Sequence, residues 1–363
     1  MTMAKAIQRG TRTLALGGAL LMVFLLPKAS AEDHVTLGRL FTHVGDFSLG
    51  EATNRTDYES VDAQTHRLYI AKMGSAQLLV FDMDKAKLLA NREGYGKITG
   101  VLAVPELHRV YASVPGAGAL SALAVGLGML GLTSGTGKVV VFDAVALQEI
   151  ARLPGGVFPD GIAFDGADGR LFVSDEFGGA VTAFDVKANK ALTRIELKGE
   201  AGNVQYDRLS ARIYVSVQSR DELAIIDPTR LWLVGRIKLG GCKHPHGLAI
   251  APDAAIAYVA CDENDVLVTI DLAAARVLRT LPVAHDPDVL AIDAGAHRLY
   301  VASESGTLST FAIADSRAPI ALGDVFVGEG AHAVAVDPLT HRLFLPLADV
   351  GGRCLLRVLL PRD

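Results

Sequence analysis

The chain has 363 residues, half of them hydrophobic, and a formal net charge of −5. Acidic charge opposes binding to a phosphate backbone, so the sequence argues against nucleic acid as a partner. Three cysteines are too few for a disulfide scaffold, so apolar burial has to hold the core.

The first 31 residues have the features of a cleaved export signal. Lys5, Arg9 and Arg12 form a basic start, residues 14–26 are an apolar run, and a small-residue cleavage site ends at Ala31. The run is shorter than the roughly 20 apolar residues that span a bilayer, so no transmembrane helix is expected in the mature chain. We expect a periplasmic or secreted protein of residues 32–363. Removing residues 1–31, with four basic and no acidic side chains, takes the net charge from −5 to −9.

A strand-like tetrapeptide centred on an aromatic residue recurs seven times. The aromatic residues of the seven copies are Tyr69, Tyr111, Phe172, Tyr214, Tyr258, Tyr300 and Phe344. Consecutive copies are 42–44 residues apart, except for one spacing of 61. One apolar strand precedes each copy and two follow it, with turn residues between them. Four short strands in about 42 residues is the period of a propeller blade. The sequence therefore predicts an all-β fold, a single seven-bladed β-propeller with four-stranded antiparallel blades.

The two ends of the mature chain suggest how the ring closes. The last repeat stops after its third strand, near residues 354–360, and the first blade begins near Asp57. Residues 35–44 are strand-like and belong to no blade, so we expect this N-terminal strand to supply the outer strand of the last blade. Such a closure leaves no end blade with an open edge.

One repeat unit also indicates a family. Residues 159–185 contain PDG, IAFD, GRLFVS and AVTAFD, and this unit resembles the YVTN-type (YncE-like) β-propeller repeat of bacterial envelope proteins. The resemblance covers nearly all of the mature chain and implies the propeller fold. It does not select a function, because propellers serve as enzymes, binding proteins and scaffolds.

The long spacing places an insertion at residues 116–137, between the second and third strands of the second blade. This segment carries no charge, which is unusual for a loop. Loops that join these strands share the top face of a propeller with the loops that enter the innermost strands. We consider three roles: a lid over the channel, a docking loop for a protein partner, or a peripheral contact with a membrane surface.

The position twelve residues before each aromatic residue marks the top of an innermost strand. If the blades superpose, these seven positions form a ring around the mouth of the central channel. Five of them can bind a cation or move a proton, and we predict them as ligand-binding residues: Asp57, Asp160, His246, Asp288 and His332. Thr99 and Gly202 occupy the other two positions.

Three ring residues come from consecutive blades and could share a divalent metal ion. Imidazole and carboxylate suit zinc or another transition metal, so His246, Asp288 and His332 are the candidate metal ligands. The competing interpretation is that these polar residues bind only water. Further top-face residues form a second tier of candidates: His244, His285, Asp175, Glu176, Asp262, Glu263 and Glu304.

Two of the three cysteines belong to the same blade. Cys242 lies in the loop that enters its innermost strand, and Cys261 ends the next strand, so both are expected at the top face. We expect a disulfide between them, and thiolate ligation of a metal is the alternative. YVTN-type relatives resemble this chain in having a cysteine at each of these places. Cys354 is expected to be a small buried apolar residue.

The function expected from these features is non-catalytic: an exported binding or scaffold protein that uses its top face for a small molecule or a protein. One alternative is a metal-dependent hydrolase of lactonase type with its site at the channel mouth. The other is a subunit of an envelope complex that docks through residues 116–137. No nucleophile motif identifies catalytic residues, so the sequence leaves them unknown.

Overall fold

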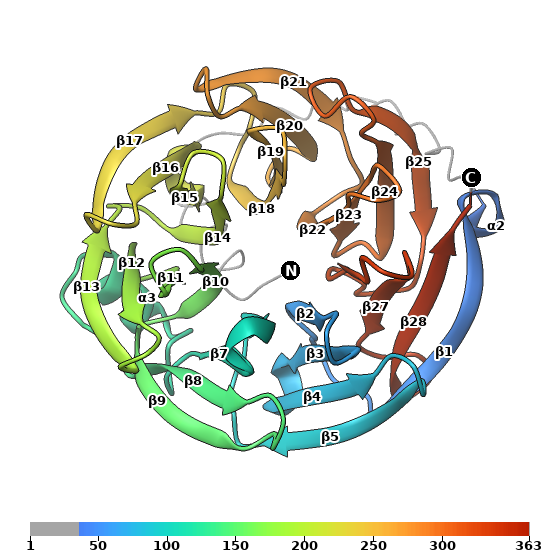
Figure 1. Cartoon of the computed structure of the whole chain (residues 1–363), viewed down its shortest axis with the longest axis horizontal. Helices are drawn as coiled ribbons and strands as arrows, with labels where there is room; N and C mark the ends of the chain where they lie inside the picture. Colours follow the sequence, from blue (N-terminus) through green and yellow to red (C-terminus); the bar gives the residue numbers. More distant parts are fainter. Residues whose placement is uncertain (1–35, 363) are drawn as a thin grey trace, which may run out of the picture.

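The computed structural model describes residues 36–362, so the predicted export signal lies outside the described residues. Seven four-stranded antiparallel sheets surround a central channel, with the innermost strand of each sheet at the channel (Figure 1). This arrangement confirms the predicted seven-bladed β-propeller. The seven predicted aromatic residues all lie in the second strand of a blade and are buried.

The first three blades follow each other in chain order from the innermost strand to the outermost. Blade 1 is β2 (Glu59–Asp62), β3 (Arg67–Lys72), β4 (Gln77–Asp82) and β5 (Lys87–Glu93). Blade 2 is β6 (Val101–Val104), β7 (Arg109–Val114), β8 (Gly137–Asp143) and β9 (Glu149–Gly156). Blade 3 is β10 (Pro159–Asp165), β11 (Arg170–Asp175), β12 (Ala180–Asp185) and β13 (Lys190–Glu196).

The next three blades repeat the same order. Blade 4 is β14 (Ala201–Asp207), β15 (Arg212–Val217), β16 (Glu222–Asp227) and β17 (Trp232–Lys238). Blade 5 is β18 (Pro245–Ala251), β19 (Ile256–Cys261), β20 (Val266–Asp271) and β21 (Arg276–Pro282). Blade 6 is β22 (Pro287–Asp293), β23 (Arg298–Ser303), β24 (Thr307–Ala312) and β25 (Ile320–Phe326).

Blade 7 joins the two ends of the chain. It consists of β26 (Ala335–Val336), β27 (Leu343–Leu347), β28 (Arg353–Pro361) and the N-terminal β1 (Phe41–Glu51). The N-terminal closure is therefore confirmed, but the strand begins later than residues 35–44. The short helix α2 (Leu37–Leu40) occupies the start of that stretch, and its Leu37 and Leu40 pack on a core cluster between blades 6 and 7.

Apolar side chains from facing sheets fill the spaces between blades. Each core cluster combines residues of two neighbouring blades, for example Phe172 of blade 3 with Val215 of blade 4. Three 3-10 turns lie between strands: η1 (Met73–Ser75), η2 (Pro105–Leu107) and η3 (Gln218–Arg220). No helix among residues 36–362 is long and apolar enough to cross a membrane.

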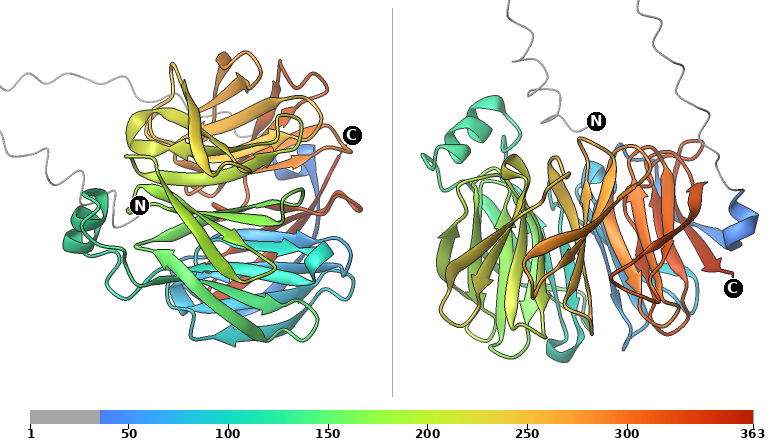
Figure 2. Two further views of the ribbon diagram at one scale, coloured as in Figure 1. Left: turned by 60° about the vertical axis from the view of Figure 1, so that its left-hand side comes forward. Right: turned by 90° about the horizontal axis from the view of Figure 1, so that it is seen from above.

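The insertion between β7 and β8 contains a helix, α3 (Ala122–Met129). Ser121 caps its N-terminus by accepting a hydrogen bond from the amide of Ala124 at 3.2 Å. The helix stands on one face of the disc, beside blades 2 and 3 (Figure 2). Its base packs against Val157, Phe158 and Phe177, while Leu123 and Leu130 are each 72% exposed.

Candidate functional site

Close packing of the innermost strands positions the ring residues. A Cβ on Gly100 would lie 1.9 Å from the carbonyl oxygen of Asp160, and one on Gly247 would lie 1.9 Å from that of Asp288. Only glycine therefore fits at positions 100 and 247, which directly follow the ring residues Thr99 and His246. The side-chain hydroxyl of Ser113 also donates to the Asp160 carbonyl at 2.7 Å. The main chain holds these carboxylates at the channel mouth.

Arg55 is the centre of the acidic half of the site. Its Nη1 lies 2.8 Å from Glu304 Oε1 and its Nη2 lies 3.4 Å from Asp288 Oδ2, while its Nε lies 3.9 Å from Asp57 Oδ2. Burial opposes the charge of Arg55, but the three carboxylates raise its pKa. Burial also opposes the ionisation of Glu304, and Arg55 nevertheless lowers its pKa to about 2.

Tyr58 and His246 connect this half to blades 3 and 4. His246 Nε2 lies 3.2 Å from Asp288 Oδ1 and 3.4 Å from the Tyr58 hydroxyl. The same hydroxyl donates to Asp160 Oδ2 at 3.4 Å and accepts a 2.7 Å hydrogen bond from Asn203 Nδ2. One network therefore links side chains of blades 1, 3, 4, 5 and 6.

Burial and neighbouring charges shift the pKa values of the acids and of the imidazole in this network. Burial and the nearby charge of Asp57 raise the pKa of Asp160 to about 7. Burial and then the charge of Asp160 raise the pKa of Glu176 well above its usual range. Burial disfavours the charged form of His246, but Asp288 raises its pKa to about 10. While it stays protonated, this imidazole donates hydrogen bonds and cannot ligate a metal ion.

His332 lies next to the acidic half of the same mouth. The residue is 3% exposed, and its Nε2 has no hydrogen-bond partner in the described residues. The nearest carboxylate is Asp57, whose Oδ1 is 3.8 Å from this nitrogen. His332 adds blade 7 to the set, so the five predicted ligand-binding residues surround one site.

A cavity of about 540 Å³ opens at this mouth. Four of the predicted ring residues line it, and so do the second-tier residues Glu176 and Glu304. One part of its wall is apolar and includes Phe158 and Phe177 of blade 3, Met73 of blade 1 and Leu120 of the insertion.

Two of the three candidate metal ligands contact each other. His246 and Asp288 are neighbours, whereas the contact recorded for His332 is to Asp57. Among residues 36–362, no group of three or more His, Cys, Asp or Glu side chains is arranged to hold a metal ion. The three-residue metal set stays a prediction.

Several second-tier residues form contacts within the loops and do not line the cavity. Asp175 is fully buried, accepts from the amides of Val157 and Phe158, and pairs with Arg194 at 2.7 Å. His285 is exposed and pairs with Asp265, and Glu263 is also exposed. Asp175 thus shapes the apolar wall of the cavity without facing its mouth.

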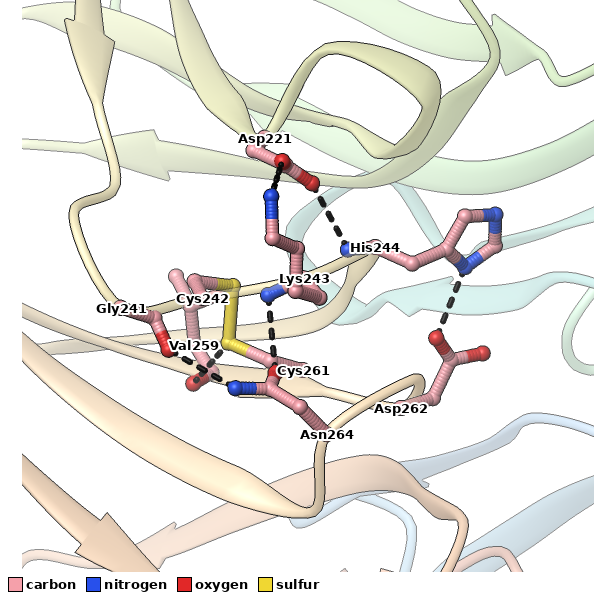
Figure 3. Close-up of a disulfide and its surroundings, with 9 residues drawn as sticks. All are labelled: Asp221, Gly241, Cys242, Lys243, His244, Val259, Cys261, Asp262 and Asn264. Atoms are coloured by element: carbon pink, nitrogen blue, oxygen red, sulfur yellow. Dashed lines mark hydrogen bonds and ion pairs between the residues drawn. A yellow bond between two sulfur atoms is a disulfide. The ribbon is translucent and has the colours of Figure 1, made fainter.

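The disulfide between Cys242 and Cys261 is confirmed, with a Cα–Cα distance of 5.4 Å (Figure 3). It lies beside His244, whose Nδ1 is 2.7 Å from Asp262 Oδ1 and whose Nε2 is 3.6 Å from Glu200 Oε2. Burial opposes the charge of His244, but the hydrogen bond with Asp262 raises its pKa to about 10. Cys354 is free and buried.

A second cavity, of about 340 Å³, lies along the innermost strands. Tyr58 lines both cavities, and Glu59 lines only this one. Both carboxylate oxygens of Glu59 are inaccessible and have no hydrogen-bond partner in the described residues. Burial raises the pKa of Glu59 well above its usual range.

Sequence reasoning missed Arg55, Tyr58 and Asn203. A sequence repeat reveals residues that recur from blade to blade, and these three occur in single blades. Tyr58 and Asn203 nevertheless carry a signal, because they occupy the position that follows the ring residue. Three other blades have glycine there, so a large polar side chain at that position stands out.

Comparison with known proteins supports the fold and does not extend to function. No protein-family model matches the sequence, and no curated protein matches it. A chain in the structure of Kuenenia stuttgartiensis hydrazine synthase is similar with a TM-score of 0.69 and 14% identity, over 87% of this chain and 97% of that chain. A chain of a mitotic checkpoint complex is similar with a TM-score of 0.71 and 12% identity, over 95% and 99%. The YVTN-type family stays a prediction.

Proposed function

We propose that this chain is an exported binding propeller that takes a small ligand at the channel mouth of its top face. The observation that carries the proposal is the convergence of polar side chains from blades 1, 3, 5, 6 and 7 on one cavity of about 540 Å³. Cavities of this size with apolar walls and a few convergent polar groups are typical of small-molecule sites.

The desolvation cost of burying these charged groups supports the same proposal. Removing charged groups from water is unfavourable, and a buried ion pair seldom repays that cost in stability. Arg55 among three carboxylates is therefore a poor choice for a purely structural channel, and so is a buried His332 whose Nε2 has no hydrogen-bond partner in the described residues. Clusters of this kind are commoner at functional sites.

Export is supported by the disulfide, because disulfides persist mainly outside the reducing cytoplasm. Under this proposal, residues 1–31 are removed and the mature chain begins at Glu32. The envelope location implied by the YVTN-type resemblance belongs to the same proposal.

The proposal is tested by calorimetry on the purified mature protein with a panel of small organic cations, anions and neutral polyols. We expect a saturable ligand whose affinity falls about tenfold or more in Asp288→Asn and in His246→Ala, because each change breaks the network. Glu263→Gln removes an exposed top-face acid and should leave the affinity unchanged. A panel without a saturable ligand, or affinities equal in all variants, contradicts the proposal.

The same protein preparation separates the alternative function, a metal-dependent hydrolase, from simple binding. That alternative requires a metal ion shared by His246, Asp288 and His332. Elemental analysis that finds about one equivalent of tightly bound transition metal, lost in His246→Ala and His332→Ala, would favour the hydrolase.

A further inference from the structure

Among the described residues, two acids of the channel-mouth cavity lack a basic partner at ion-pair distance, although the charge of His246 acts on both from farther away. Asp57, Asp288 and Glu304 each lie within 4.0 Å of an Arg55 nitrogen, and Asp288 also pairs with His246. Asp160 and Glu176 have no Lys, Arg or His nitrogen within that distance among the described residues. Their recorded side-chain hydrogen bonds are to the Tyr58 hydroxyl and to Gln218 Nε2, each at 3.4 Å.

An aromatic pair lies directly beside these acids. Phe158 is two residues before Asp160, and Phe177 follows Glu176. Their ring centroids are 5.0 Å apart, both residues are buried, and both line the cavity. Aromatic faces attract organic cations, and more strongly where water is excluded.

The uncharged insertion completes this wall. Leu120 lines the cavity, and Val125 packs with it on the cluster of Val157, Phe158 and Phe177. A Cβ on Gly128 would lie 2.7 Å from the carbonyl oxygen of Phe177, so α3 sits directly on the loop that carries Glu176. The base of the insertion therefore fixes the apolar side of the site.

The opposite side of the cavity also has an unsatisfied group. His332 Nε2 is buried without a hydrogen-bond partner, which is unfavourable unless a bound molecule supplies one. Lys97, the remaining basic residue of the lining, is exposed at the rim. Its charge is screened by solvent and does not neutralise the buried acids.

We infer that the ligand of this cavity is an organic ammonium ion with a compact apolar body. The ammonium group pairs with Asp160 and Glu176, and the apolar body packs against Phe158, Phe177, Leu120 and Met73. A cationic ligand favours the ionised forms of Asp160 and Glu176, whose pKa values burial raises, whereas an anionic ligand would oppose their ionisation. A bare metal ion would leave the apolar wall unused. This inference rests on the proposed binding function and names its ligand class.

Three probes test the inference by calorimetry at pH 7.5: benzylammonium, benzyl alcohol and methylammonium. Benzyl alcohol keeps the apolar body without the charge, and methylammonium keeps the charge without the body. We expect benzylammonium to bind the wild type about tenfold or more tightly than either control. Phe158→Leu should weaken benzylammonium binding about fivefold, because it removes one aromatic face.

The charge dependence is tested with Asp160→Asn combined with Glu176→Gln, and with each single change in case the double variant folds poorly. The preference for benzylammonium over benzyl alcohol should fall to about twofold or less in the double variant and decrease in each single variant. Glu263→Gln is the control and should keep the full preference.

Absence of saturable benzylammonium binding to the wild type overturns the inference. Equal binding of benzyl alcohol, or a preference that survives in the acid variants, overturns it as well. The proposed binding function is judged separately, by the sensitivity of any panel ligand to Asp288→Asn and His246→Ala.

Discussion

Glu59 shows how one side chain in the channel can set a pH dependence of stability. Among residues 36–362 its carboxylate has no hydrogen-bond partner, and burial raises the pKa of Glu59. The folded chain therefore keeps a proton that the unfolded chain releases above the usual glutamate pKa of about 4.3. Unfolding releases this proton more favourably as the pH rises, so the contribution of Glu59 to stability decreases from about pH 5 upward.

We expect Glu59→Gln to remove this decrease. The free energy of unfolding of the variant, relative to the wild type, should increase from pH 5 to pH 8, because glutamine has no proton to release. Urea denaturation at pH 5, 6.5 and 8 measures the difference. Glu263→Gln changes an exposed acid and should show a constant difference. Parallel profiles for wild type and Glu59→Gln would mean that Glu59 ionises normally in the fold.

At the scale of elements, the disulfide fixes the entry of β18 to the end of β19. Pro245 pairs with Cys261 in the ladder, and Cys242 lies three residues before Pro245. The amide of His244 donates to Asp221 Oδ1 at 2.9 Å, so the same loop is also tied to blade 4 (Figure 3). The crosslink thus holds the segment that carries both His244 and His246.

Replacing both cysteines by serine should lower the free energy of unfolding by about 3 kcal/mol. The estimate follows from the sequence separation of 19, because the unfolded chain has more conformational entropy without the crosslink than with it. Guanidinium denaturation of Cys242→Ser/Cys261→Ser measures the loss. Wild type kept reduced should show a loss of similar size, and Cys354→Ser alone should not reproduce the effect of reduction. A variant as stable as the oxidised wild type would show that the crosslink adds no stability.

The elements were predictable to different degrees for physical reasons. The number of repeated aromatic residues predicts the number of blades, because the second strand of every blade is buried on both sides. The N-terminal strand was harder to place, since no repeat marks it and a helical turn takes its first residues. At the site, the ring positions follow from the repeat. Arg55 and Tyr58 do not, because they are exceptions within one blade and their partners come from blades far apart in sequence.

At the scale of the whole molecule, the ring is held together where its two ends meet. β1 pairs with β28 from Phe41–Pro361 to Glu51–Arg353, and Arg357 forms hydrogen bonds of 2.9 and 2.6 Å with Asp46. Leu49 of β1 is buried in a cluster with residues of blades 1 and 7. His332 and Asp57 belong to these two blades, so the channel mouth depends on the same closure.

Leu49→Ala tests whether the ring unfolds as one unit. Loss of a buried leucine side chain should lower the free energy of unfolding by about 2–5 kcal/mol. The single tryptophan, Trp232, begins β17 in blade 4, across the ring from the closure. If closure couples all the blades, Trp232 fluorescence and circular dichroism should report the same lowered denaturation midpoint. Ile320→Ala, an exposed position on the outer strand of blade 6, should shift the midpoint little.

Different denaturation midpoints from Trp232 fluorescence and from circular dichroism would contradict cooperative unfolding of the closed ring. In that case blade 7 would open while blade 4 stays folded, as neighbouring units do in an open solenoid whose repeats contact only their neighbours. A shared midpoint has a consequence for function, because the ligand cavity draws its walls from blades 1, 3, 5, 6 and 7 and from the insertion in blade 2. A ligand that binds only the closed ring then stabilises all seven blades together. Benzylammonium should accordingly raise the denaturation midpoint followed by Trp232 fluorescence in the wild type and not in Asp160→Asn/Glu176→Gln.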